Sequence, residues 1–188
     1  MIYIAYNRLG SPGMSVQANS VEDRLLKLQL RLAQLEKQES CRENFLDFVG
    51  TMWPDFISGR HHRIIAEKLE RVARGELKRL IINMAPRHTK SEFASFLFPA
   101  WMMGKNPSMK IIQATHTTEL AVNFGRKTKN LIDSDEFKTV FPEVKLAADS
   151  KASGRWDTSR GGMYYAVGVG SNLAGRGGDL VIIDDPHS

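Results

Sequence analysis

The sequence has a single cysteine and no long apolar run, and each shortage excludes a class of protein. Cys41 is the only cysteine in 188 residues, which excludes an intramolecular disulfide and a zinc site built from several cysteines. No stretch reaches the roughly 18 consecutive apolar residues that indicate a transmembrane helix. Residues Met1 to Ser11 lack the basic patch and long apolar segment of a secretory signal. We therefore expect a protein of a reducing cytoplasm that does not enter a membrane.

The overall composition is that of a globular protein with a basic balance. Hydrophobic residues make up 42% and charged residues 25% of the chain, so disorder is not expected. The length suits one domain with an appendage, and there are no internal repeats or low-complexity tracts. The net charge of +5 favours acidic partners, of which nucleic acid is the commonest, although charge alone is weak evidence.

The first 40 residues are predicted to form a region separate from the domain at 41–188. Residues 1–19 show no periodicity and are interpreted as a flexible lead-in. From Ser20 to Gln38 the pattern predicts an amphipathic helix with a narrow leucine seam. This helix either packs on its own domain or serves as a short coiled coil or partner-docking helix, with only about two and a half heptads available. The seam consists of Leu25, Leu28, Leu32 and Leu35.

After residue 43 the pattern predicts helices first and then alternating strands and helices. Gly75 is the expected cap of the helix that precedes the first strand. Apolar strands that alternate with helices predict a mainly parallel sheet covered on both faces. A glycine pair at 161–162 suggests that two of the segments form a hairpin. The expected helices are 43–50, 62–74, 90–103 and 118–132, and the expected strands are 80–84, 110–114, 155–158, 164–169 and 180–183.

A strand-to-helix junction at residues 84–91 lacks the glycines of the common phosphate-binding loop. That loop reads G-x-x-x-x-G-K-[ST], and Met84 and Thr89 stand at its glycine positions. Lys90 and Ser91 nevertheless lie where backbone N–H groups and a helix dipole would hold a phosphate. Lys90 would reach the phosphates and Ser91 would ligate Mg²⁺. A chance Lys-Ser pair at a helix start is the alternative.

The apolar strand at 180–183 ends in two acidic residues, as a Walker B strand does. Ligands of open α/β sheets bind beyond the carboxyl ends of the strands, where these carboxylates would lie. Asp184 would hold the Mg²⁺ shell, and Asp185 would orient or deprotonate the attacking water. A strand leading into a turn at Pro186 is the alternative. The two elements in this order predict a P-loop ATPase.

Residues 43–188 also resemble a known family, the large terminase subunit of tailed bacteriophages. The family's phosphate loop is a deviant form with Pro-Arg-His ahead of a small residue and Lys-Ser. Pro86, Arg87, His88, Lys90 and Ser91 match it, and Thr89 replaces the more usual glycine. The similar segments are FLDFVGTMWPDF at 45–56, IINMAPRHTKSE at 81–92 and SNLAGRGGDLVIIDDP at 171–186.

The resemblance implies a fold, an activity and partners. The implied fold is a three-layer α/β/α P-loop NTPase, incomplete here, with a mainly parallel sheet preceded by N-terminal helices. The implied activity is ATP hydrolysis with Mg²⁺ that drives double-stranded DNA into a procapsid in the bacterial host cytoplasm. The implied partners are the terminase small subunit, the portal protein and further copies in a ring. We expect the chain to stop soon after Walker B, without the family's nuclease domain, and to hydrolyse ATP poorly alone.

The resemblance also suggests roles for residues that flank the two motifs. The region around Arg60, His61 and His62 is similar to the adenine side of the family's site, and His62 is the candidate nucleotide contact. Helix capping or a surface position for the two histidines is the alternative. Arg176 is the candidate arginine that acts on a neighbouring subunit's ATP, against a plain glycine-rich turn, and Arg87 is the alternative stabiliser of phosphate charge. Thr115, at a strand end, is a candidate contact to nucleotide or DNA.

Two other functions stay open, and DNA contacts are harder to assign. The chain could be another DNA-stimulated translocase or helicase with the same ATP core, or a truncated, non-catalytic fragment that binds DNA or a partner. Basic residues on the helix at 118–132 and in the loop beyond it are DNA-contact candidates, against a simple solvated face. They are Arg126, Lys127, Lys129, Lys145, Lys151, Arg155 and Arg160.

Overall fold

The computed structural model describes residues 15–85, 87–150, 152–171, 175 and 177–187, and it divides into two units. The units are Met1–Lys37 and Gln38–Ser188. Helix α1, Ser15–Glu43, begins in the first unit and ends in the second. No helix in the described ranges is both long and apolar enough to span a bilayer.

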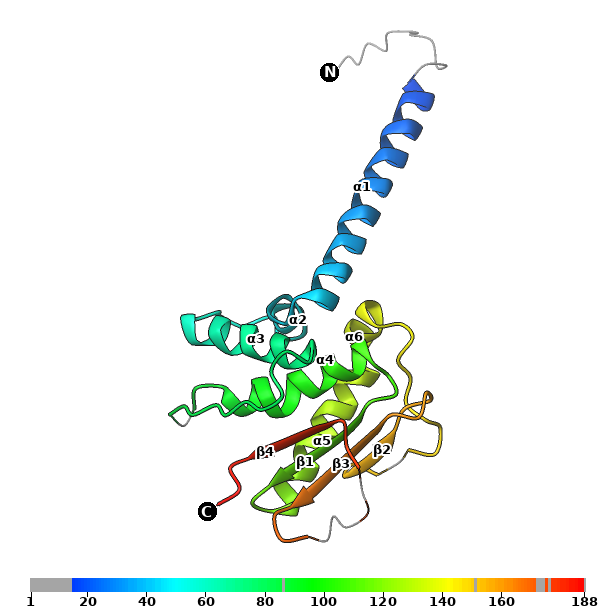
Figure 1. Cartoon of the computed structure of the whole chain (residues 1–188). Coiled ribbons are helices and arrows are strands. Elements are labelled where there is room, and N and C mark those ends of the chain that lie inside the picture. The colour runs from blue at the N-terminus through cyan, green and yellow to red at the C-terminus, as the bar shows by residue number, and fades with distance from the viewer. Residues whose placement is uncertain (1–14, 86, 151, 172–174, 176, 188) are drawn as a thin grey trace, which may run out of the picture. The chain divides into compact units, whose positions relative to one another are not determined.

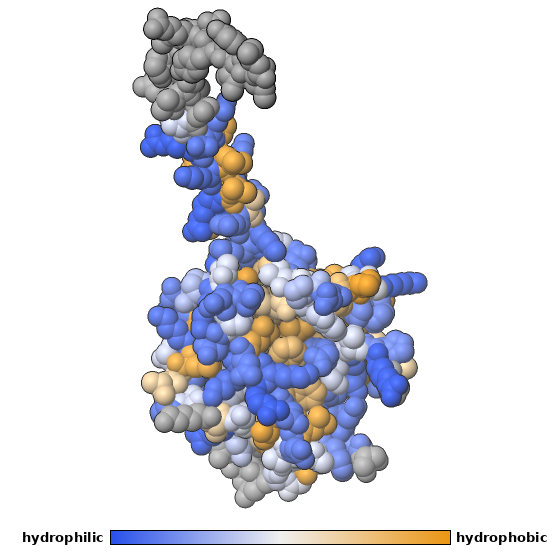
Figure 2. Space-filling view, turned by 180° about the vertical axis from the view of Figure 1, so that it is seen from behind, coloured by the Kyte–Doolittle hydropathy of each residue, from blue (hydrophilic) through white to orange (hydrophobic). Residues whose placement is uncertain are grey.

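Within the first unit, α1 confirms the helix predicted over 20–38. Figure 2 shows apolar side chains along one side of this helix. The leucines of the seam are between 45% and 67% exposed. Both interpretations of the helix, packing on its domain and partner docking, stay predictions.

Two shorter helices open the second unit where sequence signals placed them. Helix α2 is Phe45–Met52, and the Asn44 side chain caps it by accepting the Asp47 N–H. It ends just before Trp53-Pro54, because proline cannot continue a helix. Helix α3 is Arg60–Ala73. Gly75 follows it with φ 75°, and its N–H donates to the Val72 carbonyl, so the predicted glycine cap is confirmed.

The predicted helix over 90–103 is confirmed, but it contains a π-helical stretch. Backbone helicity begins at Lys90, continues through η1, Glu92–Leu97, and ends with α4, Phe98–Lys105. The next predicted helix is α5, Thr118–Asp133. Helix α6, Asp135–Val140, was not predicted, because six residues are too few to show a helical period.

The second unit is a mixed α/β structure around a four-stranded, mostly parallel sheet. The strands are β1, Lys110–Thr115; β2, Arg155–Asp157; β3, Met163–Gly168; and β4, Leu180–Asp184. Their order is β2-β3-β1-β4, and β1 runs parallel to both β3 and β4. The short β2 pairs antiparallel with β3, as the predicted hairpin requires. Four of the five predicted strand segments are therefore confirmed.

Helices η1 and α5 pack on the same face of the sheet, where Figure 1 shows α5 behind β1 and β3. Trp156 and Tyr164 stack on this face, and the Trp156 indole donates to the Gly125 carbonyl of α5. On the other face, Val181 and Ile183 of β4 are 56% and 63% exposed. The described residues thus provide one helical layer, where a layer on each face was expected.

The strand predicted over 80–84 does not form. This segment has no regular structure, and Ile81 is 85% exposed. A groove of about 940 Å³ is lined on one side by residues 77–83 and on the other by β4. A strand exists only when its backbone pairs with a neighbour, and this groove separates the segment from the nearest sheet edge. The apolar residues at 80–84, two of which are β-branched isoleucines, were therefore not enough to form a strand.

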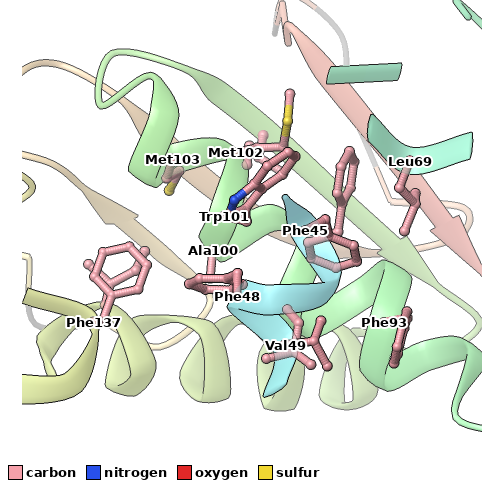
Figure 3. Close-up of a cluster of buried hydrophobic side chains, with 14 of the residues drawn as sticks. Phe45, Phe48, Val49, Leu69, Phe93, Ala100, Trp101, Met102, Met103 and Phe137 are labelled. Atoms are coloured by element: carbon pink, nitrogen blue, oxygen red, sulfur yellow. The ribbon is translucent and has the colours of Figure 1, made fainter. Parts of the chain in front are cut away.

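An aromatic cluster holds the helices of the second unit together. Figure 3 shows side chains of α2 pointing among residues from α3, η1, α4 and α6. Phe45, Phe48 and Val49 are fully buried there. This core supports η1, and the residues that lead into that helix carry the candidate site.

Candidate functional site

The loop that leads into η1 has two residues in left-handed conformations and leaves backbone N–H groups at the helix start without a described backbone acceptor. Arg87 and Thr89 adopt left-handed conformations, with φ of 64° and 62°. The first helical hydrogen bond runs from the Phe93 N–H to the Thr89 carbonyl, 3.0 Å. The N–H groups of residues 90–92 precede this bond and reach no described backbone acceptor. They are free to bind an anion at the positive end of the helix dipole.

The carboxyl end of β4 presents two acidic residues in different environments. Asp184 is 7% exposed, and one of its carboxylate oxygens accepts the Ser95 hydroxyl at 2.9 Å. Asp185 lies just beyond the strand with φ 42°, and its side chain is 65% exposed. The Asp185 carbonyl accepts the His116 N–H, which fixes the backbone at this point. Asp184 is thus held in place, while the Asp185 carboxylate faces outward.

Lys90 joins the loop to both acidic residues, across 95 positions of sequence in the case of Asp185. Its Nζ lies 2.5 Å from an Asp185 oxygen and 3.4 Å from an Asp184 oxygen. The hydrogen bond to Asp185 and the charge of Asp184 raise the pKa of Lys90, against the opposite effect of burial. The structure therefore brings together three residues that were assigned to one site from separate motifs.

A cavity of about 420 Å³ lies over the loop. Its lining combines the loop, the first helical turn and the second acidic residue, Asp185. Arg87 and His88 are exposed at its border, and Ser91 is half-buried. The predicted loop residues that line it are Arg87, His88, Thr89, Lys90 and Ser91.

His62 approaches the same loop from α3, and its ring is buried. It is 6% exposed and packs on Phe93 and Phe56, with ring centroids 5.0 Å and 4.8 Å away. Its Nε2 lies 2.7 Å from the Thr89 hydroxyl, and its Nδ1 accepts the Gly59 N–H at 2.9 Å. The ring thus contacts the loop itself, while its neighbour His61 is exposed.

We expect the protein to lose stability as the pH falls through the histidine range, in part because of His62. Burial, with a smaller effect of the charge on His61, lowers the pKa of His62 below its ordinary 6.5. Below pH 6.5 the unfolded chain binds a proton that the folded chain still excludes, so the free energy of unfolding falls until the folded pKa is passed. Urea unfolding between pH 8 and pH 5 should show a smaller decrease for His62→Gln. An equal decrease in both proteins would contradict the assignment.

Residues at the end of β1 lie beside the site but point inward. Thr115 is fully buried, and its hydroxyl donates to the Thr117 carbonyl. Gln113 is also fully buried, and no hydrogen-bond partner for its amide is present in the described part of the chain. Because the Thr115 hydroxyl is bonded to a carbonyl inside the protein, it does not face the loop cavity.

The basic residues of α5 are partly engaged within the protein. Lys127 forms an ion pair with Glu92, 2.8 Å, and the Lys129 ammonium donates to the Ser150 carbonyl. Arg126 donates to the Asn123 side chain. Their role in DNA binding stays a prediction. Charge reversal at the three positions is expected to reduce DNA-stimulated ATP hydrolysis in a complete protein, and unchanged stimulation would contradict it.

Three residues with predicted roles, Pro86, Lys151 and Arg176, lie outside the described residues. The structure adds one residue that the sequence reasoning missed, Ser95, which orients Asp184. A polar residue in the otherwise apolar run at 93–101 was the available signal. Comparison of the chain with protein-family models, curated proteins and solved structures returned no match in any of the three.

Proposed function

We propose that this chain binds ATP with Mg²⁺ at the loop 84–91 and belongs to an ATP-hydrolysing motor. The observation that carries the proposal is the contact of Lys90 with Asp184 and Asp185. Phosphate-binding lysines and Walker B acids must meet at one place for nucleotide hydrolysis. In this chain Lys90, Asp184 and Asp185 meet at a helix start whose N–H groups reach no described backbone acceptor, which supports the proposal.

The charges of the site suit a nucleotide and its cation arriving together. Without them, Lys90 is paired to two carboxylates. A phosphate would take over Lys90, and a cation would take over the carboxylates, so that no charge is left unpaired. This exchange supports a phosphate-cation complex as the ligand in preference to either part alone.

The residues present fit Mg²⁺ held jointly with phosphate. No group of three or more His, Cys, Asp or Glu side chains suitable for a metal exists within the described ranges. Mg²⁺ typically takes one or two protein oxygens and completes its shell with phosphates and water. Asp184, which Ser95 orients, and the Ser91 hydroxyl would hold it. When bound, Mg²⁺ would neutralise the charge of the phosphates.

The chain's own residues then divide the remaining tasks. Lys90 and the exposed Arg87 would bind phosphate oxygens, and the N–H groups of residues 90–92 would orient them. Asp185, outward-facing beside Lys90, would orient the water that attacks the terminal phosphate. The aspartate side chain is one methylene shorter than the more usual glutamate. The left-handed backbone of Asp185, with φ 42°, would then decide how close its carboxylate comes to the water.

The motor we propose is the DNA-packaging terminase, in its large subunit. The motifs at 45–56, 81–92 and 171–186 support this choice over other translocases with the same ATP core. Double-stranded DNA, the terminase small subunit, the portal protein and further copies of the chain would then be its partners.

A binding measurement tests the nucleotide site directly. A fluorescent ATP analogue is titrated with the chain in Mg²⁺ and in EDTA. We expect saturable binding that weakens in EDTA and in Asp184→Asn, with ATP competing. Asp179→Asn is the matched control, because Asp179 precedes β4 and its carboxylate accepts the Lys110 N–H. A folded chain, checked by circular dichroism, that binds no analogue, or binds it equally in EDTA, would overturn the proposal.

A further inference from the structure

Thr89 adopts a backbone conformation that its side chain disfavours. Its φ of 62° lies in the left-handed region, where a β-branched residue is a genuine outlier. Holding a non-glycine residue there costs on the order of 1–3 kcal/mol and requires support from the surroundings. Glycine at this position would adopt the same conformation without support. Thr89 therefore needs contacts with other residues to keep this conformation.

A continuous chain of hydrogen bonds passes through the Thr89 hydroxyl and ends on the His88 carbonyl. The Gly59 N–H donates to His62 Nδ1, so that nitrogen carries no proton and Nε2 carries it. Nε2–H then donates to the Thr89 Oγ1, and that hydroxyl donates to the His88 carbonyl at 2.6 Å. Each donor in this chain has one acceptor, so the orientation of the Thr89 side chain is fixed.

The imidazole of His62 is buried between aromatic rings. Phe56, from the segment before α3, and Phe93, from η1, enclose the ring. Across the described residues, no carboxylate forms an ion pair with it. The titratable groups on its open side are His61, 3.8 Å away between ring centroids, and His88 beyond His61. Two apolar rings and one neighbouring imidazole favour the neutral, Nε2-protonated form.

We propose that His62 is a positioning residue of the phosphate loop, which holds Thr89 in the left-handed conformation that a glycine adopts alone. The inference rests on the proposed nucleotide site and assigns to His62 a role in the loop's shape, in place of a contact to adenine. The Thr89 carbonyl accepts the Phe93 N–H, so the conformation of Thr89 sets where the helix begins. It thereby aims the N–H groups of residues 90–92 and the Lys90 side chain.

The test is a double-mutant cycle between His62 and Thr89. The variants are His62→Ala, Thr89→Gly and the two combined, titrated with the fluorescent ATP analogue in Mg²⁺. We expect His62→Ala to weaken binding about tenfold in the parent and to cause no further loss when it is added to Thr89→Gly. A residue that merely stabilises the fold would weaken binding equally in both backgrounds. That additive result, or no effect of His62→Ala alone, would overturn the proposal.

An exposed position on the same helix provides the matched control. Ile64→Ala shortens a side chain of α3 that is 48% exposed, and we expect binding to stay within about twofold of the parent, since no bond to Thr89 is lost. A loss equal to that of His62→Ala would count against the proposal.

A second readout separates this inference from the nucleotide proposal. Hydrogen exchange of the amides at residues 89–93 is measured in the four proteins of the cycle without nucleotide. We expect faster exchange in His62→Ala and no further increase when His62→Ala is added to Thr89→Gly. If the parent binds no nucleotide but this pattern holds, the positioning role stands and the ATP site fails. Unchanged exchange in His62→Ala overturns the positioning role whatever the protein binds.

Discussion

Replacing Lys90 with alanine is expected to weaken binding of an ATP analogue roughly 10- to 100-fold. A hydrogen bond between a charged donor and a charged acceptor is worth about 1.5–3 kcal/mol, and each 1.4 kcal/mol is a factor of ten in affinity. The substitution also leaves Asp184 and Asp185 without the cation that contacts both. Two uncompensated carboxylates repel an incoming phosphate, so the loss exceeds that of the contact alone.

Lys105→Ala is the matched control for this substitution. Lys105 is half-buried to a similar degree, 32% against 24% exposed for the side chains, and it also pairs with a carboxylate, that of Glu43. It lies at the end of α4, at the opposite end of the continuous helix from Lys90. We expect the Lys105→Ala protein to bind the ATP analogue with the affinity of the parent. A folded Lys90→Ala protein with parental affinity would show that the loop does not hold phosphate.

The fold was predictable where local pattern and long-range pairing agree. The apolar runs at 110–114 and 180–183 predicted strands, and both found partners in the parallel sheet. The run at 80–84 is similarly apolar, but a groove separates it from β4, so its backbone does not pair with a strand. Strand formation depends on a neighbouring backbone, which a local window of sequence does not contain. Helices satisfy their own backbone hydrogen bonds, and every helix predicted from the sequence formed, whereas one of the five predicted strands did not.

In the candidate site, too, local motifs were predictable and contacts between distant segments were not. Lys90, Asp184 and Asp185 were assigned from motifs, because a Lys-Ser pair at a helix start and an apolar strand that ends in two acidic residues are local signals. The strand expected before the loop, at 80–84, does not form. The partners that hold these residues were not predictable. Ser95 meets Asp184 across 89 positions, and His62 meets Thr89 across 27. Such pairs depend on how η1 packs against β4 and α3, which follows from the whole core and not from any one segment.

That core makes the second large effect predictable: Phe45→Ala is expected to lower the free energy of unfolding by about 3–5 kcal/mol. Phe45 is fully buried, and its ring lies 5.4 Å from Trp101, 5.6 Å from Phe98 and 5.7 Å from Phe93. Alanine removes these contacts and leaves a cavity between α2, η1 and α4, although the Phe45 N–H keeps its hydrogen bond to Glu70. Urea unfolding followed by circular dichroism measures the loss, with Ile57→Ala, an 87% exposed position, as the control that should change little.

Because this cluster supports η1, we also expect Phe45→Ala to weaken nucleotide binding under conditions in which the protein is still folded. Full affinity with lost stability would show that the phosphate loop keeps its shape without the core beneath it.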